Sequence, residues 1–285
     1  MDGPPGSPIL VVLHGLEGSS YSVYIQGMLA QAARRGWRGV AMNFRSCARD
    51  PGDLERMIPN GRPRLYHSGE TEDLDFLVRT LAAREAAPLA AIGASLGGNV
   101  LLKFLGEKGA RSGLRAAAAL STPYDLAAGA RHLESGLRRL YLEPFLKTLR
   151  PKALSAAERF PEAAARIDVE GVRRSRTFRE FDDAATAPLH GFAGADDYYS
   201  QSSSLRFLSR IGTPTLCLSA IDDPFLPGWV LERARSAASP NVEFLTPNRG
   251  GHIGFVEGPL PWRARYWAEE TAVAFLAGHL ERGGR

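Results

Sequence analysis

Three residue types that together carry out nucleophilic catalysis are spread along this 285-residue sequence. Ser95 lies in the segment GASLG at residues 93–97, two aspartates follow at Asp222 and Asp223, and His252 lies in a later glycine-rich segment. A serine hydroxyl becomes an effective nucleophile when a histidine accepts its proton and a carboxylate orients that histidine. This set of residues therefore indicates acyl transfer through a covalent intermediate, provided that the fold brings them together.

The residues around Ser95 are small enough for a sharp turn between a strand and a helix. An apolar run precedes the serine, a helical run over residues 99–107 follows it, and glycines lie two positions away on each side. In a Gly-x-Ser-x-Gly turn the small residues let the helix approach the strand while the hydroxyl projects outward. The N–H of Leu96 would then face a developing oxyanion, beside the positive end of the helix. A tight structural turn without chemistry is the alternative.

Short apolar runs alternate with longer segments in which apolar residues recur every three or four positions. The helical spacing is clearest in two groups of residues: Leu74, Leu77, Val78 and Leu81, and then Tyr266, Val273, Leu276 and Leu280. The alternation predicts one α/β domain over residues 1–285, with a mostly parallel sheet and helices on both faces. The expected strands are Ile9–Leu13, Gly39–Asn43, Leu89–Gly93, Arg115–Leu120, Thr215–Ser219 and Val242–Leu245.

Such a sheet would bring the three candidate residue types to one edge. Ser95 and the aspartate pair each follow an expected strand, and His252 follows the next strand on a glycine-rich loop that can reach back over the sheet. Open α/β sheets bind ligands at the carboxyl ends of their strands. Either aspartate satisfies this requirement.

The segment at residues 124–188 interrupts the alternation. It is rich in Arg, Ala and Glu, contains no strand-like run, and lies between two expected strands. We predict a helical lid there, with a solvated outer surface or, alternatively, a contact with anionic lipid. Four apolar residues are expected either to form the pocket wall or to pack the lid on the domain: Tyr141, Phe145, Leu146 and Phe192.

The composition excludes several classes of protein. Lys and Arg number 35 against 31 Asp and Glu, which is too balanced for a nucleic-acid surface. Cys47 and Cys217 lie far apart, so a disulfide framework is not expected and a reducing compartment fits. The N-terminus does not have the pattern of a secretory signal, and no apolar run approaches the ~18 residues of a membrane span. The predicted location is the cytoplasm.

The remaining histidines do not indicate a metal site. No zinc-ligand, Walker or dinucleotide spacing is present, so we expect neither a metal nor a cofactor. His67 is expected to be structural or to line the pocket. Three others are expected at the surface or in the lid: His132, His190 and His279.

Several segments together resemble one family. In order they are LHGLEGSS, NFRSC, YHSGETEDL, GASLGGNVLLKFLGE, STPYDL, FDDAATAP, GFAGADDYYSQSSS, AIDDPF and GGHIGF. This set, from residue 9 to about residue 258, resembles the YheT-like branch of the α/β-hydrolases, which includes lipid-acting α/β-hydrolase-domain proteins. The resemblance implies the α/β-hydrolase fold and hydrolysis of carboxylic esters, with some members acting on glycerolipids or phospholipids.

The resemblance also assigns roles to residues of the site. It implies a triad of Ser95, Asp223 and His252, because hydrolases of this fold commonly place the acid directly before a segment like Pro224–Pro227. Asp222 then becomes a turn cap. The loop LHGLEG resembles the one that supplies the second oxyanion donor, which would be the N–H of Leu16 beside that of Leu96. His14, in the same loop, is expected to order the loop rather than act as a base.

The sequence departs from the family pattern in two places. The family's NFRGC reads NFRSC here, with Ser46 in place of a glycine. Relatives also usually carry tens of residues before the LHGLEG strand, including the opening strands of the sheet. These N-terminal strands are expected to be missing, which would leave Gly39–Asn43 as an exposed edge.

The expected activity is that of a serine hydrolase which cleaves carboxylic esters of acyl or lipid-like substrates. The same triad could serve an acyltransferase or an amidase, and a catalytically silent binding module is the alternative from another class. The expected partner is a small-molecule ester or lipid, with no nucleic acid and at most a peripheral membrane contact through the lid. The sequence makes no prediction about the oligomeric state.

Overall fold

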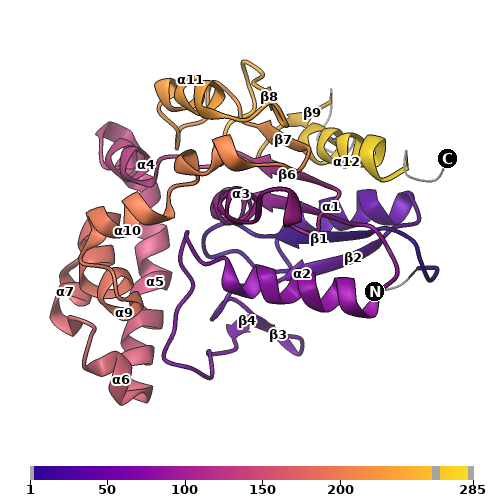
Figure 1. The fold of residues 1–285 in the computed structure, drawn as a ribbon. Coiled ribbons are helices and arrows are strands. Elements are labelled where there is room, and N and C mark those ends of the chain that lie inside the picture. The colour runs from indigo at the N-terminus through magenta and orange to yellow at the C-terminus, as the bar shows by residue number, and fades with distance from the viewer. Residues whose placement is uncertain (1–2, 259–263, 282–285) are drawn as a thin grey trace.

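A six-stranded parallel sheet forms the centre of the computed structural model, which describes residues 3–258 and 264–281 (Figure 1). The strand order is β2-β1-β5-β6-β7-β8, and each neighbouring pair is parallel. The six strands are β1 (Ile9–Leu13), β2 (Arg38–Met42), β5 (Leu89–Ala94), β6 (Ala116–Leu120), β7 (Thr215–Leu218) and β8 (Val242–Leu245). All six expected strands are present with bounds within one residue, and β2 is an edge strand as predicted.

Helices cover both faces of the sheet, which confirms the predicted α/β fold. In β1, Ile9, Val11 and Leu13 face one layer while Leu10 and Val12 face the other, because side chains alternate along a strand. The first layer contains α2 (Glu72–Arg84), α3 (Leu96–Lys108) and α11 (Gly228–Ala237), and the second contains α1 (Val23–Arg34) and α12 (Trp267–Leu280). This burial on both sides explains why the strands read as unbroken apolar runs.

The C-terminal helix is shorter than its apolar spacing suggested. Val273, Leu276 and Leu280 are buried as expected. Tyr266, however, precedes α12, belongs to the short strand β10 (Arg265–Tyr266) and is 42% exposed. β10 pairs with β9 (Val256–Glu257), so hairpin pairing takes this residue out of the buried stripe.

A second hairpin was not predicted either. It joins β3 (Arg49–Asp50) to β4 (Asp53–Met57). Most of its residues are exposed, so it lacks the alternating apolar pattern by which a half-buried strand is predicted.

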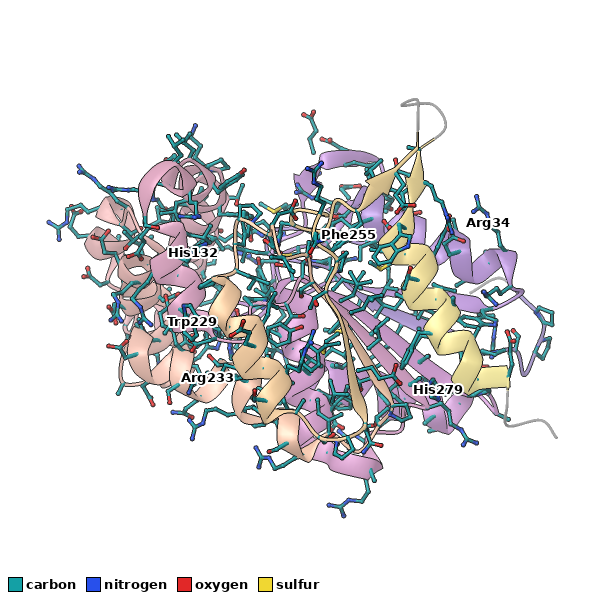
Figure 2. The ribbon with its side chains drawn as sticks, turned by 90° about the horizontal axis from the view of Figure 1, so that it is seen from above. Arg34, His132, Trp229, Arg233, Phe255 and His279 are labelled. Carbon is teal, nitrogen blue, oxygen red and sulfur yellow. The ribbon has the colours of Figure 1, made fainter. Side chains whose placement is uncertain are left out.

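The chain between β6 and β7 is helical in every described element. Its helices are α4 (Leu126–Leu133), α5 (Leu142–Arg159), α6 (Pro161–Ala164), α7 (Val169–Arg174), α8 (Phe178–Phe181), α9 (Ala187–His190) and α10 (Ala195–Ser202), with short 3₁₀ turns that continue to Arg210. Figure 1 shows most of these helices as a group beside the sheet. In Figure 2, His132 of this group and His279 of α12 lie at opposite ends of the molecule. The group has an apolar core of its own, which includes Leu146, Val172 and Phe181.

None of the helices within the described ranges combines the length and the apolar character needed to cross a membrane.

Candidate active site

Ser95 forms the whole turn between a strand and a helix. β5 ends at Ala94 and α3 begins at Leu96, and the backbone of Ser95 has φ 50° and ψ −118°. A positive φ is costly for a residue with a side chain and persists only where the surrounding structure enforces it. One such constraint is the bond from the Ser95 N–H to the carbonyl of Leu120, at 2.8 Å.

The glycines around Ser95 are required by close backbone packing. A Cβ atom on Gly93 would lie 2.3 Å from the carbonyl oxygen of Gly97, and one on Gly97 would lie 2.6 Å from that of Leu13. A Cβ atom on Gly98 would lie 2.2 Å from the hydroxyl of Thr122. The segment GASLGG therefore lets α3 pack directly against the strands while Ser95 projects into a pocket.

The fold brings Ser95, His252 and Asp223 into one hydrogen-bonded chain. His252 Nε2 lies 3.0 Å from Ser95 Oγ, and its Nδ1 lies 2.9 and 3.1 Å from the two carboxylate oxygens of Asp223. A carboxylate only accepts hydrogen bonds, so the proton of the neutral imidazole belongs on Nδ1. Nε2 is then free to accept the proton of the Ser95 hydroxyl.

Asp223 is held rigidly in this arrangement. It is 3% exposed and also accepts a hydrogen bond from the N–H of Phe225 at 2.9 Å. The ring of Phe225 stacks on the imidazole of His252, with 4.1 Å between centroids. Asp222 points elsewhere, because its carboxylate accepts from the N–H of Gly251 at 2.8 Å.

Ser121 positions the histidine loop, a role that the sequence analysis missed. Its hydroxyl accepts from the N–H of Ile253 at 3.1 Å, and it has a positive φ of 48°. It lies just after β6, in the segment STPYDL. The polar residue directly after a buried strand was the available signal, but its partner is 132 positions away.

The two candidate oxyanion donors lie beside Ser95. Leu16 and Leu96 both line the pocket that contains Ser95. Leu96 is the first residue of α3, and amides in a first turn have no acceptor within their own helix. The loop that carries Leu16 is fixed by a bond from the N–H of Gly15 to the hydroxyl of Tyr24 at 2.8 Å.

His14 orders this loop, as the sequence predicted. It is fully buried, its Nδ1 lies 2.7 Å from the carbonyl of Gly15, and its Nε2 accepts from the N–H of Phe44 at 3.1 Å. Burial lowers the pKa of His14 to about 4. A neutral ring with both nitrogens occupied is a structural element rather than a base.

A buried ion pair joins the Leu16 loop to the helical region. Lys152 of α5 donates to the carboxylate of Glu17 at 2.7 Å, and these side chains are 6% and 9% exposed. Tyr66 exchanges two bonds with Glu17, donating its hydroxyl to the carboxylate and accepting from the N–H. Glu17 directly follows Leu16 and has a φ of 59°, so the pair holds the loop at a strained residue.

Lys152→Met is expected to lower the free energy of unfolding by about 3–5 kcal/mol, because it leaves the Glu17 carboxylate buried without its cation. Urea denaturation followed by circular dichroism measures the change. Lys147→Met, on the exposed surface of the same helix, is the matched control. The double variant Glu17→Gln/Lys152→Met should recover most of the loss; a loss from Lys152→Met no larger than that of the control would contradict the prediction.

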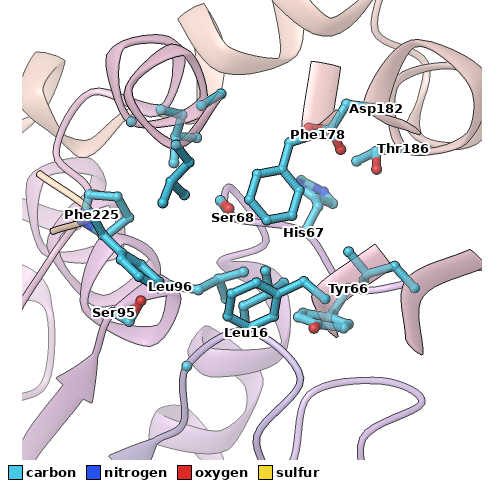
Figure 3. Close-up of a pocket in the computed structure, with 18 of the residues that line it drawn as sticks. Leu16, Tyr66, His67, Ser68, Ser95, Leu96, Phe178, Asp182, Thr186 and Phe225 are labelled. Atoms are coloured by element: carbon cyan, nitrogen blue, oxygen red, sulfur yellow. The ribbon is translucent and has the colours of Figure 1, made fainter. Parts of the chain in front are cut away.

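The pocket beside Ser95 is a cavity of about 260 Å³ between the sheet and the helical region (Figure 3). Its walls are mainly apolar, and those from the helical region include Leu126, Leu133, Phe145, Leu149, Phe178 and Phe181. On α5 the residues that face the cavity are Phe145, Leu149 and Lys152, which are spaced i, i+4, i+7.

Of the four expected wall residues, only Phe145 lines the cavity. Leu146, one position further along α5, points into the core of the helical region and is fully buried. Tyr141 is 45% exposed and packs against Phe225 in a T-shaped arrangement of the two rings. Phe192 packs against His67 and Tyr198. The apolar residues of α5 indicated that this helix forms part of the cavity wall. Which of them face the cavity depends on the rotation of α5 about its axis, and the packing of the other helices decides that rotation.

His67 lines the cavity, which was one of its two expected positions. It is buried, and its ring lies 4.5 Å from that of His190, which is half-buried at the end of α9 in the helical region. Burial lowers the pKa of both rings, that of His190 to about 4. Among the described residues no cluster of three or more His, Cys, Asp or Glu side chains is arranged to hold a metal.

Comparisons with known proteins give the same fold. A family model for the alpha/beta hydrolase fold matches residues 8–259. The Escherichia coli (strain K12) protein named "Putative esterase YheT" is 40% identical over 96% of this chain and 78% of its own length. The mouse protein named "Phospholipase ABHD3" is 35% identical over 97% of this chain, which covers 65% of that protein. Among solved structures, the Pyrococcus furiosus esterase Pf2001 superposes with a TM-score of 0.60 at 16% identity, over 98% of this chain and 84% of that chain.

Proposed function

The chain belongs to the α/β-hydrolase family as a YheT-like member and is an esterase-like or lipase-like enzyme, and we propose that it cleaves carboxylic esters through a Ser95–His252–Asp223 triad and an acyl-enzyme. The observation that carries this proposal is the unbroken chain of contacts from Ser95 Oγ through the imidazole to the buried carboxylate. Short polar contacts in this order are what proton transfer from a serine requires.

In the proposed first half-reaction, Ser95 Oγ attacks the ester carbonyl and His252 Nε2 takes its proton. The N–H groups of Leu16 and Leu96 hold the carbonyl oxygen as it becomes negative. Asp223 holds the ring in orientation and stabilises the imidazolium. The carbonyl then re-forms, the C–O bond of the ester breaks, and His252 returns the proton to the departing alcohol.

The second half-reaction repeats these steps with water. His252 Nε2 takes a proton from a water molecule that attacks the acyl-enzyme carbonyl, and the same two N–H groups hold the oxyanion. The bond to Ser95 Oγ breaks and the oxygen recovers its proton from the imidazolium. A carboxylic acid leaves and the enzyme returns to its starting state.

The substrate class follows from the cavity walls. Aromatic and aliphatic side chains from both regions line the space beside Ser95, and such a surface binds an acyl chain or another lipid-like group better than a polar one. We propose that the helical region at residues 124–188 acts as the lid of this cavity, since Phe145, Leu149 and Phe178 form part of its wall.

A fluorophosphonate probe tests the proposal directly, because it reacts with an activated serine. Wild-type protein should be labelled and Ser95→Ala should not. Ser68→Ala is the matched control, since Ser68 is another serine of the cavity wall, and it should keep its labelling. A folded wild-type protein that takes up no label would contradict the proposal and support a binding module instead.

A further inference from the structure

The end of the cavity that lies away from Ser95 carries polar groups. Figure 3 shows Asp182 and Thr186 on the opposite side of the cavity from Ser95. Phe178 lies between this pair and Ser95. Tyr199 also lines the cavity. Polar groups in an apolar cavity are costly unless they are hydrogen-bonded. Their presence at one end therefore needs a reason that the chemistry at Ser95 does not supply.

The backbone is specially shaped to present this pair. Residues 182–186 form a π-helix between α8 and α9. Pro188 lacks the N–H that would bond to the carbonyl of Ala184 in an α-helix, and that carbonyl accepts from the N–H of Asp168 instead, at 2.9 Å. The wider turn places Asp182 and Thr186, four positions apart, on the cavity side. Such π-helical turns occur frequently at functional sites.

Asp182 is held by the side chains of Tyr199 and Thr186, and a carboxyl group has more hydrogen-bonding sites than these two contacts use. The hydroxyl of Tyr199 donates to its Oδ2 at 2.7 Å, and Asp182 lines the cavity together with Thr186. Burial raises the pKa of Asp182 to about 7. The protonated form of a carboxyl group both donates and accepts, as the hydroxyl of Thr186 does.

The charges around this end indicate which ligand it would take. Among the described residues of the cavity wall, Lys152 is the one that carries an ammonium or guanidinium group. Its ammonium is already bonded to the carboxylate of Glu17. A phosphate or carboxylate would find no cation to pair with. An ammonium would depend on a carboxylate whose burial disfavours its charge. A neutral hydroxyl can donate to one of the two side chains and accept from the other.

We infer that Asp182 and Thr186 form a subsite that binds a hydroxyl group of the substrate, remote from the ester bond. Tyr199 is a positioning residue, because it holds the carboxyl group of Asp182. The preferred substrates are then esters in which the chain inside the cavity ends in a hydroxyl rather than a methyl group. This inference rests on the proposed function of Ser95.

Two matched series of esters test the inference. The first compares p-nitrophenyl esters of ω-hydroxy acids with those of plain acids, from four to twelve carbons. The second compares octanoate esters of α,ω-diols with those of plain alcohols, and so distinguishes a hydroxyl on the acyl part from one on the alcohol part. At one chain length in one series, wild type should prefer the hydroxyl ester in kcat/KM by roughly tenfold to a hundredfold.

Variants then locate the preference. Thr186→Val and Asp182→Leu should each lower the preference at least several-fold, because both remove the polar atoms of the side chain, while Thr186→Ser, which keeps the hydroxyl, should retain it. Thr80→Val is the matched control, because it makes the same change on α2 outside the cavity. Melting curves check that each variant folds; if Thr186→Val does not, the comparison of Asp182→Leu with wild type decides.

The outcomes separate the two proposals. Wild type that hydrolyses plain esters but shows no hydroxyl preference in either series overturns the subsite and leaves the triad untouched. A preference that survives both Thr186→Val and Asp182→Leu overturns it as well, as would a stronger preference for an ω-ammonium ester. Absence of turnover with every ester, combined with absence of fluorophosphonate labelling, contradicts the proposed function itself.

Discussion

Ser95→Ala is expected to lower kcat for ester hydrolysis by about 10⁶-fold, because it removes the atom that attacks the carbonyl. His252→Ala should cost a similar factor, and the double variant no more than either single one, since the two residues act as a unit. Initial rates with a p-nitrophenyl ester measure all three. Residual activity within about a hundredfold of wild type in Ser95→Ala would mean that another group is the nucleophile.

The stability of Ser95→Ala provides the control for this prediction. Serine and alanine both carry a Cβ atom, so the strain at φ 50° is the same in wild type and variant. The melting temperature should therefore change little. Ser95→Gly, in contrast, relieves the strain and should be more stable than Ser95→Ala while being equally inactive. A variant that loses activity together with its melting transition would report unfolding rather than chemistry.

The central part of this site could be predicted from the sequence because each residue follows a recognisable strand. Ser95 was marked by the glycines around it. A Cβ atom on any of these glycines would lie only 2.2 to 2.6 Å from a neighbouring atom, so the positions require glycine. Asp223 and His252 were marked by their places after β7 and β8, and parallel strands bring their carboxyl ends to one edge. The sequence predicted that Ser95, Asp223 and His252 lie near one another. It did not predict the contact distances of 2.9 to 3.1 Å between their side chains.

Features that depend on the rotation or pairing of distant elements could not be predicted. Phe145 and Leu146 are adjacent and equally apolar, and only the packing of α5 decides which of them faces the cavity. Glu17 and Lys152 are 135 positions apart and leave no local pattern. The π-helix at residues 182–186 likewise could not be predicted from the spacing of apolar residues. It lies where Pro188 has no N–H to donate the hydrogen bond that an α-helix would have.

The choice of acid gives the second large effect. Asp223→Asn is expected to lower kcat by about 10⁴-fold, because an amide carries no charge to stabilise the imidazolium and its NH₂ group favours the wrong tautomer of His252. Asp222→Asn should change kcat less than about threefold, since its side-chain oxygen can still accept from the N–H of Gly251 at the edge of the loop.

The two aspartates are adjacent, which makes Asp222→Asn a close control for Asp223→Asn. Both substitutions keep the side-chain shape and remove one negative charge from the same turn, so a difference between them reports the contact with His252 and not the general field. Steady-state rates with one p-nitrophenyl ester, and a melting curve for each variant, complete the comparison. If Asp222→Asn were the more damaging substitution, the loop that carries His252 would have to rearrange during catalysis, with Asp222 in place of Asp223 as the partner of the imidazole.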